Sequence, residues 1–171
     1  RLILAKLCHC RPQALIFEAG QFGRPFVRSP LPAQHVYFSV SHASECIAIL
    51  LSAHEDFAVD LEYCGRDIDP PSLGPRAFSY DENIWMNSAA NEDVRRDRFW
   101  TLWTLKESYI KARSMGLNLP IQRFSILPKD DGEFSLRCSS QIDESPEQWR
   151  FKSFDLGQMR YAIASLVRPI T

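Results

Sequence analysis

The sequence predicts an α+β protein built from two similar halves. Short stretches rich in aromatic and β-branched residues are typical of strands, and two well-capped helices are expected in the middle of the chain. The strand–turn–strand pattern of "VYFSVSHASECIAILLS" is also echoed near the end by "KSFDLGQMRYAIASLV". We therefore expect a first half over residues 1–56, a second half over residues 57–171, and a cleft between them, a preferred place for ligands.

The elements of the first half follow from apolar stretches separated by proline and glycine. Residues 2–8 resemble the last turns of a helix, which Pro12 would stop. Prolines and a glycine between residues 23 and 34 favour a loop with fixed turns. In order, we expect a helix over 2–8, a strand over 14–20, a loop over 23–34, a strand over 35–42 and its hairpin partner over 46–52.

The second half should begin with a strand over residues 57–62, followed by a proline-rich loop over residues 63–76. Ser79 and Glu82 have the capping-box spacing, so a helix should start there and run to about Ser88. Asn91 can cap the next helix, which we expect to reach Ser114 and stop at Gly116. The remaining strands are expected over 124–127, 133–138, 149–156 and 160–167.

Composition narrows the functional classes. The chain of 171 residues is 45% hydrophobic and 24% charged, as in a soluble globular protein. A formal net charge of −1 argues against a duplex-DNA binder or a polybasic membrane anchor. Its apolar runs are too short for a bilayer, and there is no signal-peptide pattern. Five cysteines without zinc-like pairing, "CHC" at 8–10 included, favour free thiols in a reducing cytosol.

Three acidic residues form the first candidate site. Asp60 and Glu62 are two apart on a strand, so both side chains face the same way. Glu107 and Lys111 continue, at i, i+4 spacing, a helical stripe that includes Trp103. The simpler alternatives are a strand that emerges into solvent at Asp60 and a surface ion pair between Glu107 and Lys111. Three converging carboxylates would suit Mg²⁺, or Mn²⁺ with the same ligands.

Four basic residues could supply the positive side of a polyphosphate site: Arg24, His42, Lys106 and Lys111. Each has a simpler explanation. His42 could be a satisfied histidine at a strand end, and Arg24 could be a surface residue of its loop. Lys106 points about 100° away from Glu107 on a helix, so it could merely be solvated.

Four ordered segments resemble the 4′-phosphopantetheinyl transferases of the surfactin-synthetase-activating type, which are single chains of two similar halves. These segments are "FGRP" at 22–25, "VSHA" at 40–43, "AVDLE" at 58–62 and "WTLKESYIKA" at 103–112. Two positions depart from the family: Ala43 stands where Ser is usual, and Ala58 where Gly is usual. Family members of this type also carry a longer N-terminal segment, so we expect the first half to lack part of it.

The resemblance implies a pseudo-twofold fold in which each half is a small antiparallel sheet packed with a long helix. It implies Mg²⁺-dependent transfer of the phosphopantetheine arm of coenzyme A to a serine of an acyl or peptidyl carrier protein, releasing adenosine 3′,5′-bisphosphate. The implied metal ligands are Asp60, Glu62 and Glu107, with Glu107 also the general base, directly or through a water. The other implied residues are Lys111 and Lys106 at the pyrophosphate with Asp60, and Arg24, His42 and Ser41 at the 3′-phosphate.

The resemblance also implies a cytoplasmic monomer whose partners are coenzyme A and a carrier protein, with no nucleic acid or membrane. Carrier domains present an acidic helix, so we expect a basic and apolar rim near residues 73–90. Candidates for this contact are Phe78, Ile84, Trp85 and Met86, although a core helix would use the same residues. Two alternative functions are a degenerate member that only binds coenzyme A or a carrier, and a Mg²⁺-dependent phosphohydrolase.

Overall fold

The computed structural model describes residues 1–20, 23–31, 36–65, 70–115, 119–139, 142 and 144–167. Four antiparallel sheets and several helices confirm the α+β class. The helices are α1 (Leu2–Leu7), α2 (Pro70–Ala77), α3 (Tyr80–Asn87) and α4 (Glu92–Ala112). The strands are β1 (Ile16–Ala19), β2 (Pro25–Ser29), β3 (Tyr37–Ala43), β4 (Cys46–Ser52), β5 (Phe57–Tyr63), β6 (Phe124–Pro128), β7 (Phe134–Cys138), β8 (Trp149–Leu156) and β9 (Met159–Leu166).

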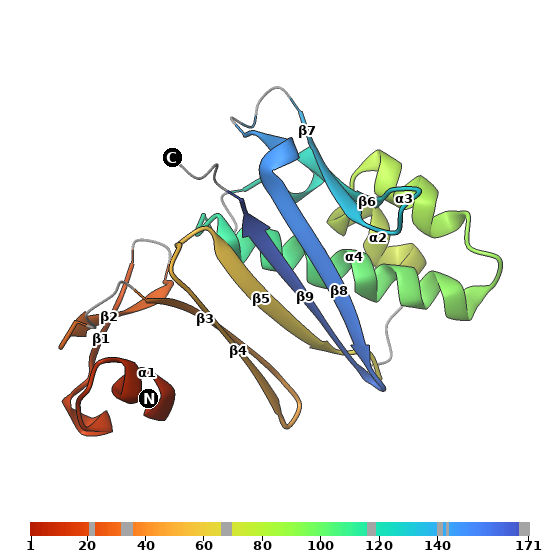
Figure 1. The fold of residues 1–171 in the computed structure, drawn as a ribbon. Helices are drawn as coiled ribbons and strands as arrows, with labels where there is room; N and C mark the ends of the chain where they lie inside the picture. Colours follow the sequence, from red (N-terminus) through yellow and green to blue (C-terminus); the bar gives the residue numbers. More distant parts are fainter. Residues whose placement is uncertain are drawn as a thin grey trace.

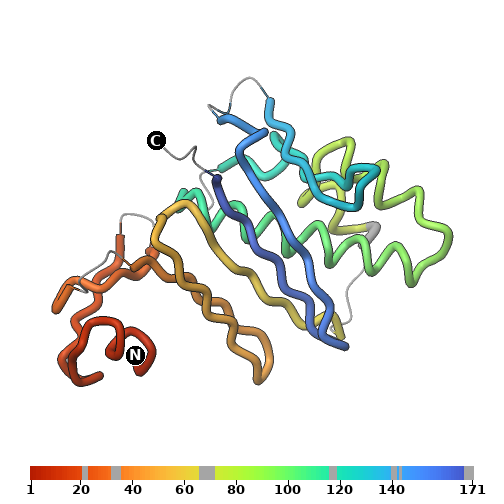
Figure 2. The backbone as a smooth tube through the Cα atoms, in the orientation of Figure 1, coloured from red at the N-terminus to blue at the C-terminus, as the bar shows by residue number. Residues whose placement is uncertain are grey.

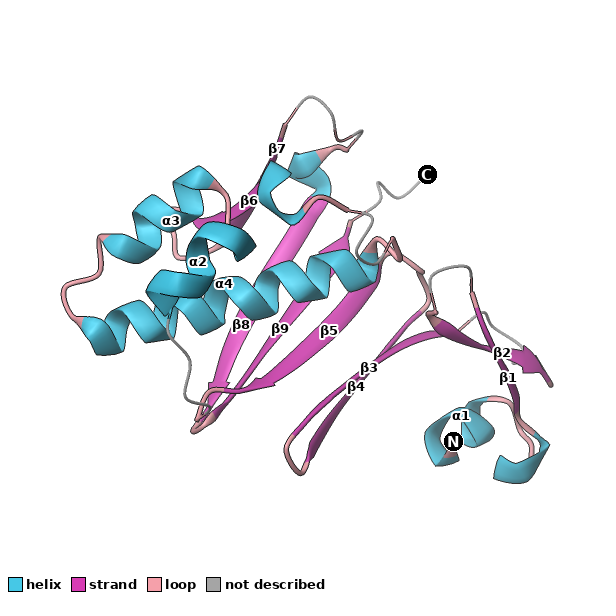
Figure 3. Ribbon diagram, turned by 180° about the vertical axis from the view of Figure 1, so that it is seen from behind, coloured by secondary structure: helices cyan, strands magenta, loops and turns pink. Residues whose placement is uncertain are grey.

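A three-stranded sheet with strand order β5–β9–β8 carries the long helix α4 along one face (Figure 1, Figure 3). Small side chains allow this close packing, because Ala58 on β5 is paired with Ala164 on β9, and both contact the core under α4. Leu105 and Tyr109 of α4 fill the space above them and are fully buried. The helix axis is therefore fixed against β5, the strand that carries the two expected acidic residues.

The strand β3 lies along the other edge of β5, and side chains rather than a backbone ladder join the two strands. Ser39 Oγ accepts a hydrogen bond from the Val59 N–H at 3.2 Å, and Ser41 Oγ accepts one from the Leu61 N–H at 3.1 Å. Both hydroxyls therefore satisfy backbone donors on the free edge of β5. The β3–β4 hairpin is thus attached to the sheet at the residues on both sides of Asp60.

The N-terminal region lies beyond that hairpin (Figure 2). Here α1 and the β1–β2 hairpin share a small core of Leu4, Leu15, Val27 and Phe38. The resemblance implied a long helix in each half, but among the described residues α4 is the one long helix, and α1 has six residues. The boundary near residue 56 falls just before β5 and stays a prediction.

Two expected loops are wrong. Residues 23–34 contain the strand β2. The strand tolerates Pro25 because a proline at its first residue costs no interior hydrogen bond. Residues 63–76 contain most of α2, in which Pro70 and Pro71 occupy the first turn, where prolines are tolerated, and Pro75 lies inside the helix. In α2, Gly74 allows a close approach to α3: a Cβ there would lie 2.6 Å from Met86 Cε.

The expected helix starts are confirmed. Ser79 and Glu82 form a complete capping box on α3, and the Asn91 side chain accepts a hydrogen bond from the Val94 N–H of α4. However, α4 ends at Ala112 rather than Ser114, which has a positive φ of 51°. The expected stop at Gly116 lies outside the described residues.

Candidate active site

The centre of the site is an ion pair between β5 and α4. Lys111 Nζ lies 2.6 Å from Asp60 Oδ1 and donates a second hydrogen bond, at 3.0 Å, to Ser41 Oγ. Ser41 Oγ in turn donates to Asp60 Oδ1 at 3.1 Å. Asp60 is 3% exposed, so this strand does not emerge into solvent there. Lys111 pairs across to β5, and not with Glu107 on its own helix.

A second contact joins the same strand and helix about two helical turns before Lys111. Trp103 Nε1 donates a hydrogen bond to Glu62 Oε1 at 2.9 Å, and the Trp103 ring stacks on Phe99. Asp60 and Glu62 thus both face α4, as their two-residue spacing predicts. Glu107 lies on the same helical line, midway between Trp103 and Lys111, so it stands between the two residues that grip β5.

The charges of Asp60 and Glu62 act on the carboxyl group of Glu107. Burial raises the pKa of Glu107, and the charges of Asp60 and Glu62 raise it further, against the lowering effect of Lys111. Burial also raises the pKa of Asp60, although the charge and hydrogen bond of Lys111 oppose that change. A site that holds like charges together in this way favours the binding of a cation.

The donor set fits a divalent cation only in part. Asp60 Oδ2 is buried and has no hydrogen-bond partner among the described residues, so one carboxylate oxygen is available for an ion. Among the described residues, however, no group of three Asp, Glu, His or Cys side chains is placed to hold a metal ion. Glu62 is engaged by Trp103. Because Mg²⁺ commonly takes one or two carboxylates plus substrate phosphates, Asp60 and Glu107 are the better-placed pair.

A cavity of about 350 Å³ opens on the Lys111 side of the site. Its wall includes Glu107, Lys111 and Arg24, so an acidic and two basic groups face one space. The Arg24 guanidinium donates hydrogen bonds to the carbonyls of Glu55 and Phe57, at 2.6 and 3.0 Å. Arg24 therefore joins β2 to the start of β5 as well as lining the cavity.

Three expected phosphate ligands, Ser41, His42 and Lys106, do not line this cavity. His42 is exposed on β3 and its neighbour Ser41 points inward, because successive strand residues face opposite sides. Ser41 is 5% exposed and occupied by Asp60 and Lys111, so it acts as a support for that pair. Lys106 is fully buried, and its ammonium group bonds to Glu82 and to the Phe124 carbonyl. This burial shows that Lys106 is not solvated. It also contradicts the expectation that Lys106 binds a pyrophosphate.

A larger cavity of about 880 Å³ is also lined by Glu107, and the sequence did not predict it. Exposed arginines from three separate segments line it, together with Trp103, Tyr80 and Asp81; the arginines are Arg76, Arg123 and Arg137. No spacing rule links these positions, because α2, the turn before β6, and β7 meet only in the folded chain. The expected basic rim near residues 73–90 is represented by Arg76.

The apolar residues expected in that rim divide into two groups. Phe78 and Met86 are 2% and 0% exposed and pack against α4. The prediction that they take part in a surface contact is therefore wrong, and the alternative of a core position is confirmed. Ile84 is 52% exposed, and Trp85 is partly buried under the Arg98 guanidinium. The helix α3 therefore uses its inner face for the core and leaves Ile84 outside.

In this α+β fold a strand and a long helix bring acidic residues together beside two cavities, an arrangement typical of an enzyme active site. The family model for the 4′-phosphopantetheinyl transferase superfamily matches residues 56–165. The chain belongs to this superfamily.

Curated relatives agree with the expected type. The chain is 33% identical over 141 residues to a 4′-phosphopantetheinyl transferase of Bacillus subtilis, covering 80% of this chain and 58% of the relative. It is also 33% identical over 125 residues to the 4′-phosphopantetheinyl transferase Sfp of Bacillus subtilis strain 168, covering 70% and 50%. The resemblance to the surfactin-synthetase-activating type is thereby confirmed, and the chain spans about half of these relatives' length.

A solved structure supports the fold. The ACPS–CoA complex of Chronobacterium ammoniagenes matches with a TM-score of 0.50 and 19% identity, covering 66% of this chain and 98% of that chain. Among the helices that the structure describes, none is both long and apolar enough to cross a membrane.

Proposed function

We propose that this chain carries the active site of a 4′-phosphopantetheinyl transferase that uses coenzyme A and an acyl or peptidyl carrier protein. One observation carries the proposal: Glu107 lines both the 350 Å³ cavity with Lys111 and Arg24 and the 880 Å³ cavity with Arg76. A carboxylate between two cavities can meet two substrates that approach from opposite sides. The smaller, basic-lined cavity suits the pyrophosphate of coenzyme A, and the larger suits the serine-bearing carrier.

In this mechanism the serine hydroxyl attacks the phosphorus atom that carries the pantetheine arm. A new P–O bond forms to the serine, the pyrophosphate P–O bond breaks, and adenosine 3′,5′-bisphosphate leaves. Glu107 accepts the hydroxyl proton, for which a pKa raised by burial and neighbouring carboxylates makes it a suitable base. Lys111 stabilises charge on the phosphates while remaining fixed by Asp60 and Ser41.

A divalent cation would complete this site. Asp60 and Glu107 would hold Mg²⁺, or Mn²⁺, through the free Asp60 Oδ2 and the Glu107 carboxylate, with Glu62 as a nearby charge. When bound, the ion would neutralise pyrophosphate charge. Arg24 and the exposed His42 are the candidates for the 3′-phosphate. The cleft between the two halves, the monomeric state and a cytoplasmic location belong to the same proposal.

Intact-mass spectrometry of several apo-carrier proteins incubated with coenzyme A, Mg²⁺ and this protein tests the proposal. One phosphopantetheine arm should be added to a carrier, and Glu107→Gln should abolish the addition while the matched variant Glu133→Gln, at an exposed residue, retains it. Coenzyme A binding without any mass gain would instead identify a non-catalytic member. Release of phosphate without a carrier would identify a phosphohydrolase.

A further inference from the structure

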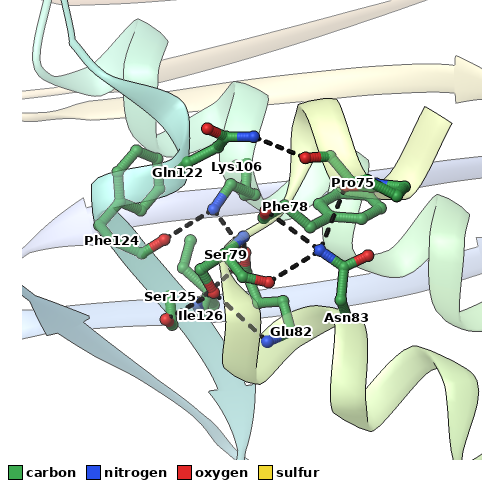
Figure 4. Close-up of polar contacts among 11 residues, drawn as sticks. Pro75, Phe78, Ser79, Glu82, Asn83, Lys106, Gln122, Phe124, Ser125 and Ile126 are labelled. Carbon is green, nitrogen blue, oxygen red and sulfur yellow. Dashed lines mark hydrogen bonds and ion pairs between the residues drawn. The ribbon is translucent and has the colours of Figure 1, made fainter.

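The side chain of Lys106 is fully buried and makes its polar contacts within the protein (Figure 4). Its ammonium group donates hydrogen bonds to Glu82 Oε2 at 2.6 Å and to the Phe124 carbonyl at 2.8 Å. The same nitrogen lies 4.0 Å from the centre of the Phe124 ring, a cation–π contact. Two of the three N–H donors of the ammonium group are thus used in hydrogen bonds within the protein, and the side chain is fully buried.

Glu82 is the other half of this buried pair and connects three elements. Its Oε2 accepts hydrogen bonds from Lys106 and from the Ser79 N–H at 2.8 Å, which completes the capping box of α3. Its Oε1 accepts a hydrogen bond from the Ile126 N–H of β6 at 2.8 Å. One carboxylate thus fastens the start of α3 and a backbone donor of β6 to α4.

A hydroxyl pair reinforces the same junction. Ser79 Oγ and Ser125 Oγ lie 2.7 Å apart and share a hydrogen bond (Figure 4). Both serines line the 880 Å³ cavity, as do Tyr80 and Asp81, which follow Ser79 in the chain. The Lys106–Glu82 pair, together with the two serine hydroxyls, therefore fixes one wall of the larger cavity.

The same cavity is also lined by Glu107, the residue after Lys106 in α4. Lys106 and Glu107 point about 100° apart on the helix, so one turn of α4 serves both the buried junction and the site. A shift of α3 or β6 relative to α4 would change the distance between Glu107 and the cavity wall. An acceptor bound against that wall would then be misplaced with respect to the base.

We infer that Lys106 is a positioning residue, which with Glu82 fixes the acceptor-side wall of the site relative to Glu107. This inference rests on the proposed transfer to a carrier protein. It assigns the lysine of the "KES" segment to the carrier side of the reaction, although no atom of Lys106 touches either substrate. A ligand of the pyrophosphate would act on the coenzyme A side instead.

The test compares Lys106→Met, Glu82→Gln and the double variant in a double-mutant cycle. Lys106→Met leaves Glu82 buried and charged, whereas the double variant removes both charges and keeps one amide oxygen, which can accept from either the Ser79 or the Ile126 N–H but not from both. In folded Lys106→Met, kcat/KM for the carrier should fall about 10- to 100-fold, as for a small misplacement of reacting groups. Coenzyme A affinity, measured by calorimetry, should stay at the wild-type value, and the double variant should recover part of kcat/KM.

Two results in the folded variants would reject the inference. If Lys106→Met weakens coenzyme A binding by about tenfold or more, the lysine is a phosphate ligand. If the folded variants lower the thermal midpoint but leave kcat/KM for the carrier unchanged, the pair is only structural. Should Lys106→Met fail to fold, the double variant decides alone, since it leaves no unpaired charge: wild-type kinetics in it would reject positioning, and a loss confined to the carrier would support it.

The failure of the proposed function would look different. A wild-type chain that transfers nothing to any apo-carrier would reject the proposed function and, with it, this inference. A wild-type chain that transfers the arm, together with variants whose carrier kinetics are unaltered, would reject the inference alone.

Discussion

Lys111 Nζ lies 2.6 Å from Asp60 Oδ1, and this pair joins the long helix α4 to the strand β5. Lys111 is only partly buried, whereas Asp60 is almost fully buried. The partly exposed cation can therefore reach a substrate phosphate while its contact to Asp60 and Ser41 keeps it in place. The second oxygen of Asp60 has no hydrogen-bond partner among the described residues and remains available for an ion.

Lys111→Met should destabilise the fold at neutral pH. The variant leaves the Asp60 carboxylate buried without its counter-charge, which should lower the free energy of unfolding by about 1–3 kcal/mol. Urea denaturation at pH 7 measures this difference. The double variant Lys111→Met, Asp60→Asn should recover part of the loss, and equal midpoints for Lys111→Met and wild type would show that the pair makes no net contribution.

Glu107→Gln should stabilise the metal-free protein at neutral pH. Because the pKa of Glu107 is raised in the folded chain, the folded state holds this proton more tightly than the unfolded chain does. Stability is therefore lost as the pH rises from the ordinary glutamate range through the raised pKa. A neutral glutamine avoids that loss, so at pH 7 the variant should be more stable by about 1 kcal/mol.

Urea denaturation in EDTA between pH 4 and pH 8 checks this prediction. The gain should shrink as the pH falls towards the unperturbed glutamate pKa of about 4.3, since both chains then carry a neutral group. Glu133→Gln, at an exposed residue, should show no such gain. A Glu107→Gln variant that is less stable than wild type at pH 7 would contradict the assignment of electrostatic strain to this position.

Addition of Mg²⁺ should raise the thermal midpoint of the wild-type protein. An ion that binds the folded state between Asp60 and Glu107 stabilises that state by mass action, and it also relieves the repulsion between the two carboxylates. Differential scanning fluorimetry with Mg²⁺, with EDTA and with NaCl at matched ionic strength measures the effect. An equal rise in Glu107→Gln would place the ion elsewhere.

Glu62 should matter less than Asp60 for catalysis. Glu62→Gln retains a carbonyl oxygen that can accept the Trp103 N–H, so we expect a loss in kcat/KM of no more than about tenfold, as for residues around a metal site. Asp60→Asn removes the charge that faces Lys111 and the free oxygen, and its loss should be larger. Steady-state kinetics across Mg²⁺ concentrations compare the two variants. A larger loss in Glu62→Gln than in Asp60→Asn would identify Glu62 as the principal metal ligand.

Local rules were sufficient for the acidic strand and for the helix starts. The alternation of β5 predicts that Asp60 and Glu62 share a face, and i, i+4 spacing predicts that Glu107 and Lys111 share a line. Both relations depend only on the periodicity of a single element. The Ser79 capping box and the Asn91 cap are equally local, and the structure confirms them.

Long-range packing decided the features that the sequence did not predict. The burial of Lys106 depends on Phe124 and Glu82, which lie 18 and 24 residues away in the chain. The capping-box pattern accounts for Glu82 locally but gives no sign that the same carboxylate also binds a lysine and β6. The arginines of the larger cavity likewise come from three separate segments that only the tertiary fold brings together.

The arginines of the larger cavity should set the affinity for the carrier protein. Arg76 and Arg123 are exposed and line the space beside Glu107, where they would meet the acidic helix of a carrier. Charge reversal by Arg76→Glu or Arg123→Glu should raise KM for the carrier about 3- to 10-fold, and the difference from wild type should shrink with added salt. Coenzyme A affinity should stay unchanged.

Kinetics at two salt concentrations, with calorimetry for coenzyme A, measure these effects. Lys152→Glu is the matched control. Lys152 is exposed on β8, so this substitution reverses the same charge at a position away from the cavity. If Lys152→Glu raises KM for the carrier as much as the arginine variants do, only net charge matters. The larger cavity would then lose its role as the carrier-binding side, since a local contact requires the effect to depend on position.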